Sequence, residues 1–272
     1  MSGLGLFTRT RWADRAGLLS VLTITLMTLA AGVITPFDPQ SRVAAAYLAP
    51  SAAHWFGTDE IGRDLFSRVL QGAQLTWLPA VTVIGLALFF GAAVGLVSGA
   101  LGGWVDLTLQ RVVDLFLVLP PMLIALTVVA VLGPGIVNTV IALVIFWWPW
   151  YARITRDEVR RLKGRPHFEA AQLGGIDPFC LWFRYLLPGA VPALVVAATL
   201  DVANVVLAMA LMSFLGLGQP APAAELGAMT ARSLESLTVY WWLPILPAAA
   251  VWLMCLSANL AGDGLRSVLR GA

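Results

Sequence analysis

Six long apolar runs, separated by shorter polar segments, set the pattern of hydrophobic and polar positions along the chain. The runs cover residues 17–35, 77–101, 115–132, 136–152, 190–216 and 240–261. A helix needs about 20 apolar residues to cross the hydrocarbon core of a bilayer. The runs lack the alternation of lipid-facing strands, and helices satisfy their own backbone hydrogen bonds in lipid. The pattern therefore predicts an all-α integral membrane protein with six transmembrane helices.

The composition agrees with this prediction. The 272 residues are 59% hydrophobic and 12% charged, whereas a soluble domain carries about 25% charged residues. A formal net charge of +2 gives no sign of nucleic-acid binding. Cys180 and Cys255 lie in different segments and match no disulfide or metal-site spacing. The first run follows Arg9, Arg11 and Arg15 as a signal peptide would, but it exceeds the usual apolar core of about 7–15 residues, so we interpret it as an uncleaved span.

Basic residues are distributed unevenly between the polar segments. With six spans and a cytoplasmic N-terminus, 13 of the 17 lysines and arginines face the cytoplasm and four face outward. Cytoplasmic segments are typically the basic ones, so both termini are expected inside the cell. Aromatic residues gather at the inner end of the fourth run and the outer start of the sixth, as at membrane interfaces: Trp147, Trp148, Trp150 and Tyr151, and Tyr240, Trp241 and Trp242.

The polar segments also suggest an organisation along the chain. Residues 1–76 are expected to hold a cytoplasmic start, the first span and an outer amphipathic helix that begins at Thr58. Residues 77–262 form a five-span core with a cytoplasmic loop at 153–188, and residues 263–272 form a cytoplasmic tail. The outer helix either seals the packing of the spans or contacts another protein.

The loop at 153–188 begins as a basic continuation of the fourth span, RITRDEVRRLKGRP. Arg153, Asp157 and Arg161 are spaced for ion pairs along one helical face. We interpret the charges as a solvated helix end near anionic lipid headgroups rather than as a specific contact. Pro166 then interrupts the chain direction.

After this proline, HFEAAQL predicts about two helical turns, which Gly174 and Gly175 would end. Asp177 is placed to cap a further helix with Pro178 at its first position. The apolar stripe of that helix would pack it onto the bundle; the stripe consists of Phe179, Trp182, Phe183 and Leu186. A short helix with two alanines can approach a partner protein closely, although an ordered loop without a partner fits the same pattern.

The segment EAAQLGGIDPFCLWFRYLLPG (169–189) resembles the loop signature of ATP-binding-cassette (ABC) importer permeases. The positions that match the signature are Glu169, Ala170, Ala171, Gly175, Leu187 and Pro188. Tyr185 stands where the family usually has an aliphatic residue. The resemblance implies that the short helix docks on an ATPase subunit and transmits its movement to the membrane helices.

Five further segments are similar to the C-type permease of the dipeptide, oligopeptide and nickel importers. They cover residues 54–76, 102–121, 131–138, 213–222 and 259–270. The resemblance implies a type I ABC-importer permease fold in a bacterial cytoplasmic membrane, a B-type permease as heterodimer partner, one or two ATPase subunits or a fused ATPase, and an extracytoplasmic substrate-binding protein. ATP and Mg²⁺ would be held by the ATPases, with no cofactor in this chain. Met209 stands where members often carry a glutamate, so a role tied to that carboxylate is not expected here.

Two sets of polar residues are further site candidates. Asp201 is the only ionisable residue inside an apolar run, and Asn204 shares its helical face. A buried aspartate must face protein or water, so the pair lines a translocation pathway or forms a bond between helices; we favour the bond. In the outer segment, the candidates for contact with a binding protein are Thr58, Asp59, Arg63 and Asp64.

Small residues and prolines shape the predicted spans. Gly91, Gly95, Gly99 and Gly103 recur every fourth residue and indicate close helix packing. The pair Pro120–Pro121 can bend the third span.

Missing motifs narrow the function. The chain has no G-x-x-x-x-G-K-[ST] loop for ATP, and His54 and His167 fall on opposite sides of the membrane. Together with these absences, the resemblance implies a non-catalytic permease subunit that forms half of a pore for short peptides. A secondary transporter driven by an ion gradient is the rival, although such a transporter needs ionisable sites between spans. Nickel and haem remain alternative cargoes.

Overall fold

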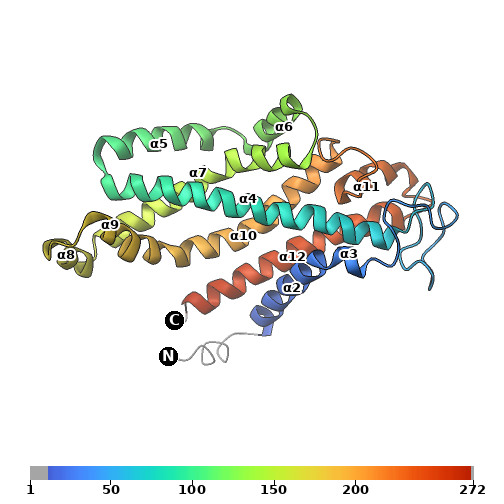
Figure 1. The fold of residues 1–272 in the computed structure, drawn as a ribbon, viewed down its shortest axis with the longest axis horizontal. Coiled ribbons are helices and arrows are strands. Elements are labelled where there is room, and N and C mark those ends of the chain that lie inside the picture. The colour runs from blue at the N-terminus through green and yellow to red at the C-terminus, as the bar shows by residue number, and fades with distance from the viewer. Residues whose placement is uncertain (1–11, 271–272) are drawn as a thin grey trace.

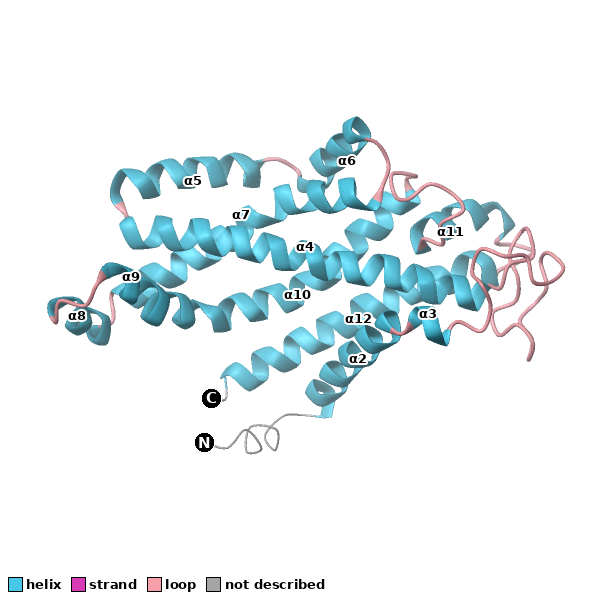
Figure 2. Ribbon diagram, viewed as in Figure 1, coloured by secondary structure: helices cyan, strands magenta, loops and turns pink. Residues whose placement is uncertain are grey.

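The computed structural model describes residues 12–270, and within this range the chain folds as helices and loops without a β-strand (Figure 2). Arg9 and Arg11, which contribute to the predicted charge asymmetry, lie outside the described residues. The all-helical prediction is confirmed for the described part of the chain.

Long helices run lengthwise in an elongated bundle (Figure 1). The helices, in chain order, are α2 (Trp12–Leu29), α3 (Ala31–Ile34), α4 (Leu65–Leu101), α5 (Gly103–Val118), α6 (Pro121–Leu132), α7 (Ile136–Lys163), α8 (Pro166–Leu173), α9 (Pro178–Leu181), a π-helical segment (Trp182–Leu186), α10 (Leu187–Phe214), α11 (Leu226–Ser233), a 3₁₀ turn (Leu234–Ser236) and α12 (Trp242–Arg270). Helix α8 lies at one end of the bundle, and α11 and the loop before α4 lie at the other. We call these the coupling-loop end and the outer-loop end.

Within residues 12–270, four stretches of helix are long and apolar enough to cross a membrane. They are Leu65–Leu101, Ile136–Lys163, Pro178–Phe214 and Trp242–Val268. The first predicted run gives only a shorter apolar helix, Arg15–Leu29, which lies along α12. In the described part of the chain, length and composition therefore support four spans, or five if a bent helix pair is one span, and the predicted number of six is not confirmed.

The third predicted span is not one helix. Helices α5 and α6 meet at an angle of 86°, and together they count as at most one broken span. The break falls at Leu119 and Pro120, whose backbones are extended, and Pro121 opens α6. A proline lacks an N–H donor and disfavours helix in the residue before it, so the pair bends the chain as predicted.

Helix α4 begins twelve residues before the predicted second span. It runs without interruption for 37 residues, and Asp64 caps its start by accepting a hydrogen bond from the Ser67 backbone N–H at 2.8 Å. The expected separate amphipathic helix beginning at Thr58 is therefore wrong, because its second half is the first part of α4 and its first half is loop. The domain boundary expected between residues 76 and 77 falls inside this helix.

Three glycines of α4 hold it against α7. A β-carbon on Gly91 would lie 2.5 Å from the Trp148 carbonyl oxygen, and one on Gly95 would lie 2.4 Å from the Ala152 carbonyl oxygen. Gly99 meets Val159 in the same way. The predicted close packing is confirmed for these three positions. It is wrong for the fourth glycine, residue 103, which opens α5 and has open space beside it.

Two apolar clusters fill the bundle. The larger cluster joins α4, α7, α10 and α12 along most of their length and includes Trp77, Leu143 and Met212. The smaller cluster lies at the coupling-loop end and consists of Leu96, Val159, Leu162, Phe168, Leu181 and Leu186. This second cluster fixes the position of the loop that carries the predicted docking helix.

The ion pairs of α7 differ from those predicted along one helical face. Asp106, at the start of α5, accepts hydrogen bonds from Arg156 Nε at 2.5 Å and from Ser98 Oγ at 2.6 Å. Arg153 pairs with Asp114, and Arg161 pairs with Glu158 at 2.6 Å. Asp114 on α5 thus replaces Asp157 as the partner of Arg153, whereas Arg161 pairs with Glu158 on its own helix. A partly buried arginine between helices, such as Arg156, needs a counter-charge there. The interpretation of these charges as a solvated helix end is wrong for Arg156.

Candidate functional site

Helix α8, the predicted docking helix, is an exposed eight-residue helix between α7 and α9. Its start follows Arg165, with Pro166 at the first position, and Gly174 and Gly175 end it as predicted. Gly175 has a φ of +76°, a left-handed conformation that side chains other than glycine adopt with strain. The turn therefore fixes where α8 stops and which residues face outward.

One face of α8 holds it to the bundle, and the other is free. Phe168 inserts into the small apolar cluster, and Ala171 packs at its edge. Glu169 and Ala170 are exposed. Of the signature residues after the helix, Gly175 and Pro188 are exposed, whereas Leu187 packs against the small cluster. The signature thus combines residues presented to solvent with residues that anchor them.

Leu173 is a candidate contact residue that the sequence reasoning missed. Its side chain is 90% exposed, although leucine is among the residues most often buried. It lies four positions after Glu169, so both side chains fall on the same face of α8. This helical spacing is a signal that could have identified it.

The segment after α8 confirms one local prediction and corrects another. The Asp177 side chain accepts a hydrogen bond from the Phe179 backbone N–H at 2.9 Å, as expected of a helix cap. The predicted apolar stripe does not pack as a unit. Phe179 and Phe183 are exposed, whereas Leu181 and Leu186 are buried. The π-helical segment at 182–186 shifts the register by inserting an extra residue into the turn, so the face that packs differs from that of a regular α-helix. Tyr185 packs at the edge of the small cluster.

Asp201 joins two helices in the middle of the bundle. Tyr151 on α7 donates a hydrogen bond from its hydroxyl to Asp201 Oδ2 at 3.0 Å, and Asn204 donates to Oδ1 at 3.1 Å. The favoured interpretation, a bond between helices, is confirmed. Tyr151 is fully buried, so its assignment to an aromatic interfacial belt is wrong. Asn204 is exposed on the surface of this chain.

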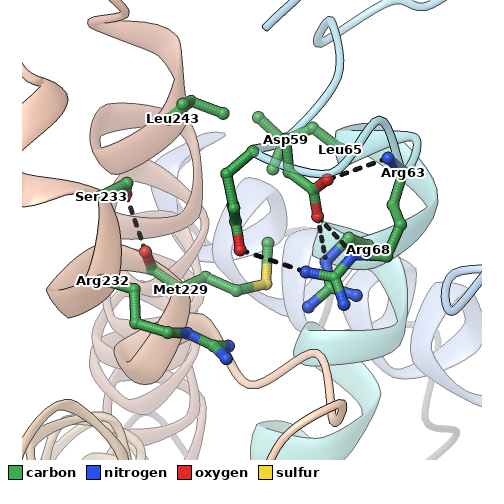
Figure 3. Close-up of a pocket in the computed structure, with 9 residues that line it drawn as sticks. Asp59, Arg63, Leu65, Arg68, Met229, Arg232, Ser233 and Leu243 are labelled. Carbon is green, nitrogen blue, oxygen red and sulfur yellow. Dashed lines mark hydrogen bonds and ion pairs between the residues drawn. The ribbon is translucent and has the colours of Figure 1, made fainter. Parts of the chain in front are cut away.

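The four outer candidates lie in the loop before α4, and all four are buried. Thr58 donates to the Ala45 carbonyl at 2.7 Å, and Asp64 accepts from His54 Nδ1 at 2.9 Å. Asp59 lies 2.5 Å from Arg63 Nε. Figure 3 shows Asp59 directed at the arginines beside it. These side chains hold the loop together, which argues against the direct contact expected of them.

Both histidines have the positions expected from the sequence. His54 belongs to the outer-loop end, and His167 lies in α8. Among residues 12–270, no group of three or more His, Cys, Asp or Glu side chains could hold a metal ion. Cys180 and Cys255 are free thiols.

A comparison with protein families identifies the family to which the chain belongs. Residues 91–270 match the family described as the binding-protein-dependent transport system inner membrane component. The chain belongs to this family. The matched range contains α8. It also contains the residues of α7 and α10 that belong to the two apolar clusters.

Known permeases of this family resemble the chain over most of their length. The chain is 36% identical to the probable D,D-dipeptide transport system permease protein DdpC of Escherichia coli, over 92% of this chain and 84% of that protein. It is 35% identical to the nickel transport system permease protein NikC of Escherichia coli, over 98% and 96%. It is 37% identical to the di/tripeptide transport system permease protein DppC of Pseudomonas aeruginosa, over 93% and 86%. The protein is a permease component of the inner membrane, and the predicted family is confirmed.

One solved structure has a similar fold. A crystal structure of an amino acid ABC transporter with histidines aligns with a TM-score of 0.55 and 18% identity, over 76% of this chain and 95% of that chain. At this identity the likeness concerns the fold alone.

Proposed function

We propose that this permease forms half of the translocation pore of an ATP-driven importer of short peptides. One observation carries the proposal: α8 presents Glu169, Ala170 and Leu173 on a free face, while Phe168 anchors the opposite face in the small apolar cluster. A helix held in this way can lie in the groove of an ATPase subunit and pass that subunit's movement to α7 and α10.

The partners follow from the same proposal. A B-type permease completes the pore as a heterodimer, ATPase subunits bind ATP and Mg²⁺ below α8, and an extracytoplasmic substrate-binding protein delivers the cargo. The chain itself is non-catalytic. Charge asymmetry supports an orientation with both termini and α8 in the cytoplasm.

The proposed cargo rests on the names of the relatives. Relatives are named for dipeptides and di/tripeptides, although another is named for nickel. We therefore favour short peptides over nickel or haem.

Uptake measurements test both the energy source and the cargo. A strain that expresses the complete importer should take up di- to tetrapeptides. Uptake should stop when the partner ATPase loses its phosphate-loop lysine, and it should persist when the proton gradient is collapsed while ATP is maintained. Uptake that follows the proton gradient and ignores the ATPase mutation would establish the secondary transporter instead.

A further inference from the structure

One guanidinium nitrogen at the outer-loop end is buried without a hydrogen-bond partner. Arg68, in the first turn of α4, is 1% exposed. Its Nη1 donates to the Pro39 carbonyl at 2.8 Å, and its Nε lies 3.4 Å from Asp59 Oδ2. Its Nη2 has no partner among the described residues. A buried charged donor left unpaired is costly, so this nitrogen indicates a contact that the isolated chain lacks.

The charges around Arg68 are unbalanced. Asp59 serves both Arg63, at 2.5 Å, and Arg68, and its Oδ1 is already occupied by two backbone N–H groups. Glu60 pairs with Arg63 at 3.2 Å on the exposed side. Arg232 of α11 makes no ion pair within the described part of the chain, and its Nε donates to the Ala228 carbonyl at 3.2 Å. Three guanidinium groups and two carboxylates therefore line this region, and only Arg63 and Arg68 are paired with those carboxylates.

These groups line a small pocket between the start of α4 and α11 (Figure 3). Its volume is about 10 Å³, which is room for roughly one water-sized atom. Glu60 and Arg232 are exposed and form its mouth, whereas Arg68 lies inside. A peptide or a nucleotide does not fit, but a single carboxylate oxygen does. A positive pocket of this size matches the tip of an acidic side chain.

We propose that this pocket, the Arg68 pocket, receives the carboxylate of an aspartate or glutamate from the substrate-binding protein. Arg232 makes the contact at the rim, and Arg68 Nη2 makes the buried one. This inference rests on the proposed function, because it requires a binding protein that docks on the outer-loop end. The four candidates predicted from the sequence would then support the docking residues rather than touch the partner.

Binding measurements on the assembled importer in lipid nanodiscs test the proposal. Arg232→Gln should weaken the affinity for the purified binding protein by about tenfold, because it removes one member of a charge pair that becomes desolvated on docking. Arg68→Lys, which keeps the charge and loses the forked donors, should also weaken it. Arg42→Gln removes an exposed arginine from the same end and is the control, with unchanged affinity expected.

A double-mutant cycle identifies the partner group. Each exposed acid on the binding protein is replaced by its amide and measured against wild-type and Arg232→Gln importers. One acid should show non-additive effects, since its partner is already gone in the second background. Additive effects for every acid, or normal affinity in Arg232→Gln, would overturn the proposed contact between the Arg68 pocket and the binding protein. Because Arg232 is exposed, its variant stays informative even where Arg68→Lys fails to assemble. Failure of the wild-type importer to bind any binding protein would instead defeat the proposed function, and the pocket with it.

Discussion

The two ends of the bundle differ in whether their polar side chains are exposed to solvent or buried against one another. At the coupling-loop end, a short helix between tight turns points Glu169 and Leu173 into solvent. At the outer-loop end, an irregular loop buries charged side chains such as Asp59 and Arg68 against one another. The first arrangement leaves surface free for a partner, and the second uses polar groups to hold a loop that has no regular backbone pairing. Substitutions on the free face of α8 should therefore reduce coupling, whereas removing the buried carboxylate of Asp59 should reduce stability.

The largest effect is expected for Asp59→Ala. The change leaves Arg63 and Arg68 buried without their shared counter-charge, and breaking a buried pair costs about 3–5 kcal/mol. Denaturation of the purified permease in detergent should show this loss. The matched control is Glu60→Ala, which removes a neighbouring but exposed carboxylate and should cost less than about 1 kcal/mol. Equal losses in the two variants would show that burial does not set the difference.

A smaller effect, and of another kind, is expected for Leu173→Ser. The exposed leucine contributes nothing to packing within the chain, so the free energy of unfolding should change by less than about 0.5 kcal/mol. Affinity for the ATPase subunit should nevertheless fall about tenfold or more, because burying a leucine contributes about 1.5–3 kcal/mol. Leu173→Met keeps the apolar volume and should retain binding. Unchanged co-purification and substrate-stimulated ATP hydrolysis in Leu173→Ser would remove this residue from the interface.

The smallest effect is expected midway between the ends, for Asp201→Asn. An amide still accepts the hydrogen bond from Tyr151, and hydrogen bonds between membrane helices contribute about 0.6 kcal/mol on average. Peptide uptake should fall by less than about threefold, with Tyr151→Phe behaving similarly. Two results together would make this aspartate an ion-coupling site: loss of uptake in Asp201→Asn, and wild-type uptake that follows the proton gradient.

The same contrast explains what could be predicted from the sequence. The turns around α8 depend on neighbours in sequence, so the ends at Gly174 and Gly175 and the cap at Asp177 were predicted correctly. The bend at Pro120–Pro121 was also predicted, because it depends on the local sequence. Its angle of 86° depends on what α5 and α6 pack against.

Contacts between distant residues were the ones that could not be predicted. Arg153 takes Asp114, 39 positions away, instead of Asp157 one turn along its own helix. Asp64 rather than Thr58 caps α4, because Thr58 is held by the backbone of Ala45 and Leu48. A single sequence carries no record of which distant groups meet, and near a membrane many arginines have equally plausible local partners.

Helix α4 has a consequence for how the two ends communicate. At 1.5 Å per residue, its 37 residues form a rod of roughly 55 Å. Close packing at Gly91, Gly95 and Gly99 locks this rod to α7, which leads directly into α8. Under the proposed function, a push on α8 would act on one end of a long rod whose far end carries Arg68, and Pro79 inside α4 is the position at which this rod can bend.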